Sequence, residues 1–320
     1  MPRTSVVVPT CNRAHLLRET LPTLLAQTEQ DLEIVIVDNA STDGTAALIE
    51  AGRDPRLRLV RSDRQVPQME NWTRAIHAAR GDYVALYHDD DLYAPDIVAR
   101  SRAFLEGQPT VGMVHVGARR FGAGRRDLGP WRAARRDFVR SGRAEALRWI
   151  ATIHDVVPSS TMVRRALYAT VGGFEPDLLC ADFDLYVRMA LVTDIGFIAG
   201  PLLSVRVHDA STTDRMGPGR WVDEVERLLP RFRTHLAAAG VIPPAGWPSV
   251  ERRLRARFAR RLQRLELSLL ARGESARAAE AHAAAHALDG RLLSRLLAGS
   301  LALLDRPAGR RLLGLARAAR

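Results

Sequence analysis

The N-terminal third of the chain alternates short apolar runs with longer segments of helical periodicity. Five runs rich in β-branched residues are typical of buried strands, and they lie at residues 5–10, 32–38, 56–60, 82–87 and 111–116. Between them, residues 14–27, 42–51, 69–79 and 95–106 have the pattern of helices. Strands that alternate with helices of this length favour right-handed crossovers. They therefore predict a mostly parallel sheet with helices on both faces.

The rest of the chain follows a different pattern. Residues 121–143 hold seven arginines and two glycine-flanked breaks, so we expect an irregular insertion or a mobile loop there. After Trp221 the periodicity is helical, and the predicted helices cover residues 221–239, 250–271, 275–288 and 291–304. A proline-containing linker at 241–248 separates the first two of these helices. We therefore predict an α/β region followed by an all-α region.

Charge and composition exclude several classes of function. All 47 residues counted as Lys or Arg are arginines, which excludes a Schiff-base lysine and a phosphate-loop lysine. Residues 1–110 carry 12 arginines and 16 acids, net −4, whereas residues 111–320 carry 35 and 20, net +15. Aromatic residues make up only 6% and do not interleave with basic ones. We therefore expect no nucleic-acid partner and favour an anionic membrane surface or a phosphate-bearing ligand.

The sequence carries no sign of secretion or of a membrane span. Cys11 and Cys180 are too few for a disulfide framework and too far apart for a zinc site. No apolar run reaches the roughly 20 residues that cross a bilayer. The N-terminus also lacks the apolar core and cleavage site of a secretory signal. We expect a cytoplasmic protein.

Parallel sheets of this kind bind ligands at the carboxyl ends of their strands. Asp38 follows the second predicted strand, where its carboxylate could accept hydrogen bonds from a base or a ribose. The alternative is that residues 38–45 form an ordinary strand-to-helix connection. The first strand is followed by "PTCNR" and not by G-x-G-x-x-G, which makes a dinucleotide-binding dehydrogenase improbable.

Three consecutive aspartates, Asp89, Asp90 and Asp91, follow the fourth predicted strand. Like charges packed this closely need a cation or hydrogen-bond donors. Pro95 indicates that the chain turns here, and a turn lets two carboxylates converge on Mg²⁺ or Mn²⁺ together with substrate phosphates. The alternative is a solvated acidic turn before the next helix. Asp63, after the third strand, either faces the same crevice or is a turn residue.

Several segments, in order, carry a resemblance to a known family. They are "SVVVPTCNR", "LEIVIVDNASTDGT", "RLRLVRSD", "ARGDYVALYHDDDLYAPD", "VGGFEP" and "ADFDLYVRM". Together they resemble the family 2 inverting glycosyltransferases over about residues 4–210. The resemblance implies a GT-A domain at 1–215, made of a nucleotide-sugar half (1–118) and an acceptor half (119–215). The helical region at 216–320 lies outside the resemblance.

The resemblance also implies roles for individual residues. The nucleotide pocket would be formed by Pro9, Thr10, Asn12, Arg13, Asp38, Asp63 and Asp89. Asp90 and Asp91 would hold Mn²⁺ or Mg²⁺, and His208 matches a histidine that approaches the diphosphate or the metal in some relatives. Many relatives carry Asp where His88 stands, which leaves open whether His88 supports the metal ligands or is only a strand residue.

Asp182 matches the position of the catalytic base in that family. Relatives usually carry an acidic pair where this chain has Ala181-Asp182, so Asp182 is the candidate base and Asp184 the substitute. Inverting transfer needs one base for the acceptor hydroxyl and a Lewis acid for the leaving nucleoside diphosphate. The acceptor would be a saccharide or a lipid-linked saccharide of the cell envelope. The alternatives are a sugar nucleotidyltransferase and a non-catalytic, membrane-associated scaffold.

The predicted helix at 250–271 has a basic and an apolar side. Eight arginines and two glutamates lie between Glu251 and Arg272, beside a stripe made of Leu254, Phe258, Leu262, Leu265 and Leu269. The pattern suits an amphipathic helix lying on an anionic membrane. It suits a helix that packs on the catalytic domain equally well. Residues 291–304 could pack on the stripe or enter the membrane interface.

Overall fold

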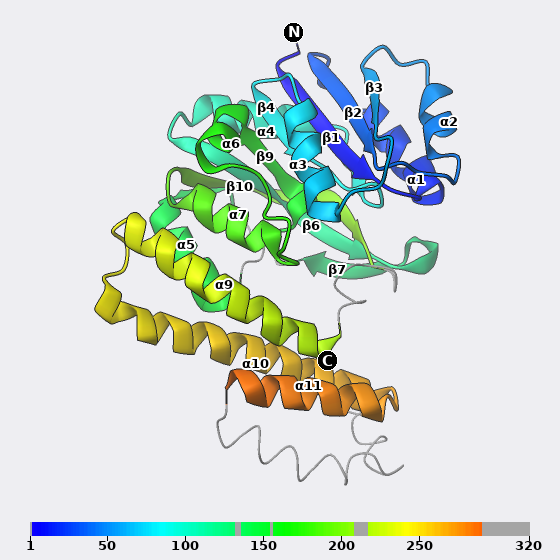
Figure 1. Cartoon of the computed structure of the whole chain (residues 1–320). Coiled ribbons are helices and arrows are strands. Elements are labelled where there is room, and N and C mark those ends of the chain that lie inside the picture. Colours follow the sequence, from blue (N-terminus) through cyan, green and yellow to red (C-terminus); the bar gives the residue numbers. More distant parts are fainter. Residues whose placement is uncertain (1, 132–135, 154–155, 208–216, 290–320) are drawn as a thin grey trace. The chain divides into compact units, whose positions relative to one another are not determined.

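A computed structural model describes residues 2–131, 136–153, 156–207 and 217–289 (Figure 1). The chain divides into two compact units. Residues 1–147 and 154–208 form the first, which we call the sheet unit. Residues 148–153 and 209–320 form the second, which we call the helical unit. His208 and residues 291–304, for which the sequence suggested roles, lie outside the described residues.

The strands of the sheet unit form one mixed sheet, in the order β3-β2-β1-β4-β9-β6-β10-β5, with β7 beside β6 and β8 beside β10. Their bounds are β1 (Thr4–Thr10), β2 (Leu32–Asp38), β3 (Leu57–Arg61), β4 (Tyr83–Leu86), β5 (Leu92–Tyr93), β6 (Val111–Phe121), β7 (Asp127–Trp131), β8 (Phe138–Arg140), β9 (Thr161–Arg164) and β10 (Asp194–Arg206). Strands β3, β2, β1 and β4 are parallel neighbours, and β6 runs parallel to β10. Strand β9 is antiparallel to both β4 and β6. The five strands predicted in the N-terminal third are present.

Helices cover the sheet as the alternation predicts. Those of the sheet unit are α1 (Ala14–Leu25), α2 (Thr45–Glu50), α3 (Gln68–Ala78), α4 (Ile97–Gly107), α5 (Gly142–Thr152, which continues into the helical unit), α6 (Arg165–Val171) and α7 (Ala181–Ala190). Alternate residues such as Val6, Val8, Ile34 and Ile36 share one apolar core with residues of α1, α2 and α4. Helix α3 packs on β1 and β2 from the opposite face (Figure 1).

Two sequence expectations were wrong in detail. Helix α2 begins at Thr45 instead of residue 42, because Gly44 has a φ of 87° and interrupts helical geometry. The arginine-rich stretch at 121–143 is not wholly irregular, since it contains β7, β8 and a short 3-10 helix, η1 (Ala123–Arg125). Strand β8 pairs with β10, and the Arg140 guanidinium lies 4.1 Å from the Phe138 ring centre. Charged residues on short edge strands hide the usual strand pattern.

The helical unit contains α9 (Pro218–Ala238), η3 (Pro244–Gly246), α10 (Trp247–Ala271) and α11 (Ser275–Leu288). Four members of the apolar stripe on α10 are buried, namely Leu254, Phe258, Leu262 and Leu269. Helix α10 packs on both α9 and α11, and its Phe258 ring lies 5.8 Å from that of Trp221 on α9. Of the two interpretations left open by the sequence, a stripe on a membrane and a stripe packed on protein, the structure shows the packed one, and the partners are α9 and α11.

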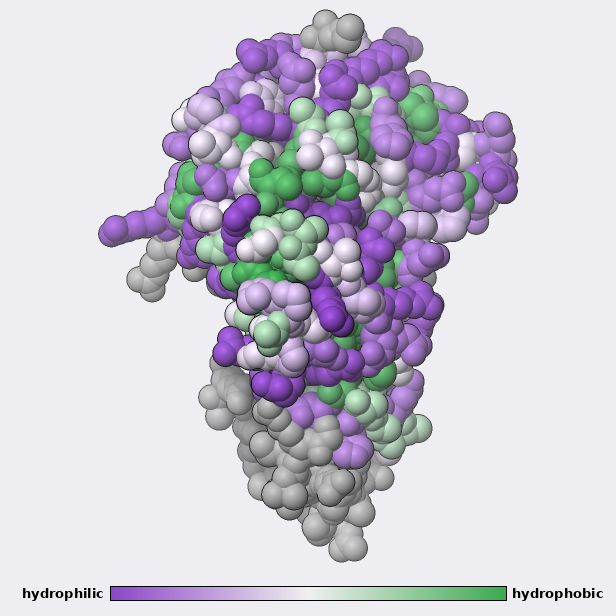
Figure 2. All heavy atoms as spheres, turned by 60° about the vertical axis from the view of Figure 1, so that its left-hand side comes forward, coloured by the Kyte–Doolittle hydropathy of each residue, from purple (hydrophilic) through white to green (hydrophobic). Residues whose placement is uncertain are grey.

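The described surface is mainly polar. Hydrophilic side chains dominate the face drawn in Figure 2, where hydrophobic ones appear in small patches. The large hydrophobic residues that are exposed are Trp131, Val139, Leu147, Val192 and Val207. Among the described helices, none combines the length and the apolar character needed to cross a membrane.

The backbone of β1 lies against Gly81, in the turn before β4, so we expect one methyl group added at Gly81 to destabilise the protein. A Cβ added at Gly81 would lie 2.8 Å from the Ser5 backbone nitrogen, in a place where only backbone could move. We expect Gly81→Ala to lower the free energy of unfolding by about 2 kcal/mol, measured by urea denaturation. Gly107→Ala is the control, because nothing lies within 4 Å of its added Cβ. Equal unfolding midpoints for the two variants would contradict this packing.

Candidate active site

The carboxyl ends of β1, β2 and β4 meet at one edge of the sheet, and their loops form a single frame. Asn12, in the loop after β1, joins the loop after β2 in two places. Its backbone N–H donates to Ser41 Oγ at 2.8 Å, and its Oδ1 accepts a hydrogen bond from the Thr42 backbone N–H at 2.8 Å. The φ of Asn12 is 54°, a left-handed value that Asn tolerates better than most residues. The predicted pocket loops therefore do come together.

Asp89 is held by β1 and the loop that follows it. Thr10 Oγ1 donates to Asp89 Oδ2 at 2.6 Å, and Arg13 Nη1 donates to Asp89 Oδ1 at 3.1 Å. The same Arg13 nitrogen donates to Asp90 Oδ2 at 2.9 Å. Burial raises the pKa of Asp89 to about 6, although the Arg13 charge acts in the opposite direction. The Arg13 guanidinium, 76 positions before Asp89 in the chain, thus pairs with two of the three aspartates.

Asp91 is held by elements from the other half of the sheet unit. Ser159 Oγ, in the 3-10 turn η2 (Pro158–Ser160), donates to Asp91 Oδ2 at 2.5 Å. The Arg206 backbone N–H, at the end of β10, donates to Asp91 Oδ1 at 2.9 Å. The Arg206 side chain also donates to the Asp90 carbonyl oxygen at 2.9 Å. Burial raises the pKa of Asp91 to about 7.

The acidic turn itself is fixed by two hydroxyl groups. Thr20 Oγ1 on α1 lies 3.1 Å from the Asp89 carbonyl oxygen and 2.9 Å from that of Asp91. The His88 backbone N–H donates to the Tyr93 hydroxyl at 2.7 Å, and that hydroxyl lies 3.1 Å from the His88 carbonyl oxygen. The chain therefore leaves the sheet after Leu86 and turns before β5, which confirms the turn predicted from Pro95.

His88, Asp90 and Asp91 form a group that could hold a metal ion. Each offers one ligand atom, and the three atoms lie within 4.8 Å of one another. His88 Nδ1 is 3.7 Å from Asp91 Oδ2, whereas His88 Nε2 is buried without a hydrogen-bond partner in the described part of the chain. Two carboxylates and one imidazole are a ligand set that fits a divalent cation. The structure thus places His88 beside the predicted ligands, a role that the sequence left open.

Asp38 and Asp63 lie in different environments. Asp38 is fully buried, its Oδ1 accepts a hydrogen bond from the Ser41 N–H at 3.1 Å, and its Oδ2 lies 3.4 Å from Arg61 Nε. Asp63 is exposed in the loop after β3 and has no ion pair or hydrogen bond among the described residues. Pro9 is buried within β1. Asp38 therefore belongs to the frame of the site, whereas Asp63 lies outside the set of joined side chains.

Asp182 and Asp184 both begin α7 but have different surroundings. Asp184 is fully buried, and it accepts a hydrogen bond from Arg188 Nε at 2.8 Å. Arg188 also donates to the carbonyl oxygens of Val171 and Gly173, so this pair anchors the helix. Asp182 is partly exposed.

Burial lowers the pKa of His88, while the charges of the nearby acids, Asp182 included, act to raise it.

An aromatic contact joins the two parts of the site. The Trp72 ring on α3 lies 5.0 Å from the His88 ring and 5.3 Å, edge to face, from that of Phe174. The Phe174 N–H also donates to Thr73 Oγ1 at 3.0 Å, which attaches the segment before α7 to α3. Sequence spacing did not reveal these contacts, nor those of Ser159 and Arg206. Ser159 and Arg206 reach the acidic turn because β9 pairs with β4 and β10 pairs with β5.

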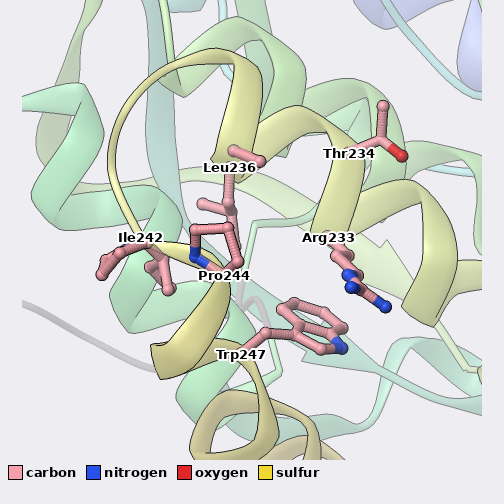
Figure 3. A pocket seen from close by; sticks show the side chains of 8 residues that line it. Arg233, Thr234, Leu236, Ile242, Pro244 and Trp247 are labelled. Carbon is pink, nitrogen blue, oxygen red and sulfur yellow. The ribbon is translucent and has the colours of Figure 1, made fainter.

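Two cavities of the described chain lie away from this site. One of about 380 Å³ in the helical unit lies between α9 and the start of α10, where Arg233 and Trp247 lie opposite Ile242 and Pro244 (Figure 3). A wider one of about 820 Å³ lies near the amino end of β4, beside Tyr83. Neither is lined by Asp89, Asp90 or Asp91. The candidate active site is therefore identified by its chemistry and its place at the strand ends.

The sequence comparisons identify the family. The glycosyl transferase family 2 profile matches residues 5–172, more than half of the chain, and the chain belongs to this family of enzymes. It is 29% identical over 250 residues to the uncharacterized protein MT1568 of Mycobacterium tuberculosis, covering 71% of this chain and 75% of that protein. It is 36% identical over 100 residues to the succinoglycan biosynthesis protein ExoO of Rhizobium meliloti, covering 31% of this chain but only 29% of ExoO.

The comparisons with solved structures show the same fold. Residues 1–349 of S. aureus TarS, in complex with UDP-GlcNAc, match with a TM-score of 0.64 and 18% identity, over 99% of this chain and 92% of that one. The mannosyltransferase PcManGT from Pyrobaculum calidifontis, in complex with GDP-Man and Mn²⁺, matches with a TM-score of 0.55 and 24% identity, over 98% and 83%. The expected GT-A fold with an added helical region is confirmed.

The two ion pairs of Arg13 predict a loss of stability when this side chain is removed. Arg13→Gln leaves Asp89 and Asp90 without the cation that they share, and Asp89 is almost fully buried. We expect the free energy of unfolding of the metal-free protein to fall by about 2 kcal/mol, measured by urea denaturation. In the control Arg100→Gln, both partners of the lost pair are exposed, and we expect about 0.5 kcal/mol or less. Similar losses in both variants would show that Arg13 does not support the acidic turn.

Proposed function

We propose that this glycosyltransferase moves a sugar from a nucleoside-diphosphate sugar to an acceptor hydroxyl, with inversion at the anomeric carbon. The observation that carries the proposal is the grouping of His88, Asp90 and Asp91 at the carboxyl ends of the parallel strands. Asp182 is near enough for its charge to act on the pKa of His88. Such a reaction needs carboxylates that bind a cation, and a separate carboxylate that takes the proton from the acceptor hydroxyl.

The donor would bind across the frame made by the loops after β1 and β2. Asp38 ends β2 and Arg13 lies in the loop after β1. Asp38 Oδ2 forms an ion pair with Arg61 but accepts no hydrogen bond among the described residues. A base or ribose group would supply a hydrogen-bond donor. Pro9, Thr10 and Asn12 would complete the pocket, and Asp63 stays a proposed contact from the loop after β3. Thr10 anchors Asp89 by its hydrogen bond. The solved complexes of TarS with UDP-GlcNAc and of PcManGT with GDP-Man support a nucleotide-sugar donor.

His88, Asp90 and Asp91 would hold Mn²⁺ or Mg²⁺, whose charge stabilises a leaving diphosphate. Arg13 contacts Asp90 and has a guanidinium that can also pair with phosphate oxygens. His208 remains a proposed further contact and lies outside the described residues. The structure of PcManGT with GDP-Man and Mn²⁺ supports a metal in this fold.

Asp182 would remove the proton from the acceptor hydroxyl. It lies in the first turn of α7, where the helix dipole favours the ionised carboxylate that a base requires. Asp184 is a poor substitute, because its carboxylate is buried and paired with Arg188. We place this base on the acceptor side of the site, since α7 belongs to the proposed acceptor half.

The acceptor would be a saccharide, free or lipid-linked, in the synthesis of a cell-envelope polysaccharide. The name of ExoO, a succinoglycan biosynthesis protein, supports this class of acceptor. We expect the enzyme in the cytoplasm, with peripheral attachment to the membrane. Membership of family 2 favours sugar transfer over nucleotidyl transfer and over a non-catalytic scaffold.

The metal assignment predicts that nucleotide binding depends on a cation. We expect nucleoside diphosphate to raise the melting temperature only when Mn²⁺ or Mg²⁺ is present. Asp90→Asn should weaken diphosphate binding at least tenfold, or about 1.4 kcal/mol, because it removes a charged metal ligand. Asp96→Asn, at an exposed carboxylate of the same segment, is the matched control. Equal diphosphate affinity with chelator and with metal would overturn the assignment.

The base assignment predicts a separation of binding from transfer. Asp182→Asn should keep the affinity for nucleoside diphosphate and lose about two to four orders of magnitude in transfer, measured as product formed per enzyme. Asp184→Asn should instead lower the melting temperature, since it disturbs the buried pair with Arg188. Transfer at a nearly normal rate by Asp182→Asn would move the base elsewhere.

A further inference from the structure

One side of α10 carries a row of four exposed arginines, Arg253, Arg257, Arg260 and Arg264. Their spacing of four, three and four positions places them on one face of the helix. With a rise of about 1.5 Å per residue, the row is about 17 Å long. We call these four residues the arginine ridge.

The arginine ridge lacks counter-charges within the described chain. None of its four members makes an ion pair or a hydrogen bond with another described residue. Other arginines of the helical unit are compensated, as Arg255 is by Glu226 and Glu251. Positive charges three and four positions apart on a helix repel one another. A row of this kind lowers the stability of its own helix, and an anion bound along it would remove that cost.

The remaining sides of α10 exclude insertion of this helix into a bilayer. Leu254, Phe258 and Leu262 are buried in contact with the rest of the helical unit. A partner can therefore reach the ridge from outside but cannot reach the apolar stripe. The contact between the ridge and its partner would therefore be electrostatic and confined to the exposed side of α10.

We propose that the arginine ridge docks the helical unit on the anionic headgroups of a lipid membrane. Arginine favours phosphate groups, because its planar guanidinium donates two parallel hydrogen bonds. A straight row of charges suits a flat array of headgroups. Nucleic acid fits less well, because the aromatic residues of α10, Trp247 and Phe258, are buried and offer no surface for base stacking.

The proposal goes beyond sugar transfer and does not depend on it. Vesicle binding by the ridge needs neither the metal group nor Asp182, so each proposal can fail while the other stands. Docking would bring the enzyme to a membrane surface, where lipid-linked saccharides are found.

The test is sedimentation of the full chain with vesicles of phosphatidylcholine, alone or mixed with phosphatidylglycerol. We expect binding to the mixed vesicles only, and weaker binding as salt is raised. Each basic residue near an anionic surface contributes about fivefold in partitioning, so replacing the whole ridge should reduce binding at least a hundredfold. The ridge variant replaces these residues by glutamine: Arg253, Arg257, Arg260 and Arg264.

A matched control removes the same charge from other exposed positions of the helical unit. It replaces these residues by glutamine: Arg220, Arg252, Arg272 and Arg277. We expect the control to keep most of its vesicle binding. Equal binding by the two variants, or no binding by the unchanged chain at low salt, would overturn the proposal. So would release of the unchanged chain from vesicles by stoichiometric duplex DNA, which would favour a nucleic-acid partner.

A second variant keeps the test decisive if the fourfold change disturbs folding. Arg257→Gln with Arg260→Gln alters only the centre of the ridge, and we expect about a 25-fold loss of vesicle binding. Its melting temperature should be equal to or higher than that of the unchanged chain, because the change relieves repulsion along the helix, and its nucleoside-diphosphate affinity should be unchanged. A double variant that binds vesicles normally would contradict the proposal.

Discussion

The ion pairs between Arg13 and the carboxylates of Asp89 and Asp90 are the interaction on which the site depends. Asp89 is buried at a strand end, where an unpaired carboxylate would cost several kcal/mol. Arg13 supplies the opposite charge, and Thr10 supplies a hydrogen bond. Because both donors belong to β1 and its loop, the acidic turn after β4 has one position relative to the proposed nucleotide pocket.

The three aspartates divide into different roles once their partners are known. Asp89 is bound on both oxygens by β1 and its loop, and Asp91 is bound by η2 and the end of β10. These contacts make the two residues supports between the halves of the sheet unit. Asp90 and His88 lie next to these supports, and together with Asp91 they offer the ligand atoms that a cation would need. Rigid support of the ligands lowers the cost of ordering them when substrate binds.

The helical unit shows how one sequence pattern can serve two structures. An apolar stripe flanked by arginines is typical of a helix on a membrane and of a helix in a core. Burial of Leu254, Phe258 and Leu262 decides for the core. The same burial turns the remaining arginines outward, so the arginine ridge is a consequence of packing and not of the stripe itself.

The sequence by itself determined the alternation of strands and helices, the buried strands β1 and β2, and the place of the acidic turn. These features follow from local patterns, since side-chain periodicity and turn residues act over a few positions. It also contained the segments that resemble family 2, and those led to Asp182. Only the tertiary structure decided which side chains meet the aspartates, because Ser159 and Arg206 lie 68 and 115 positions from Asp91 along the chain. Burial likewise separated Asp182 from Asp184, two acids of the same helical turn, because solvent access depends on the packing of distant segments.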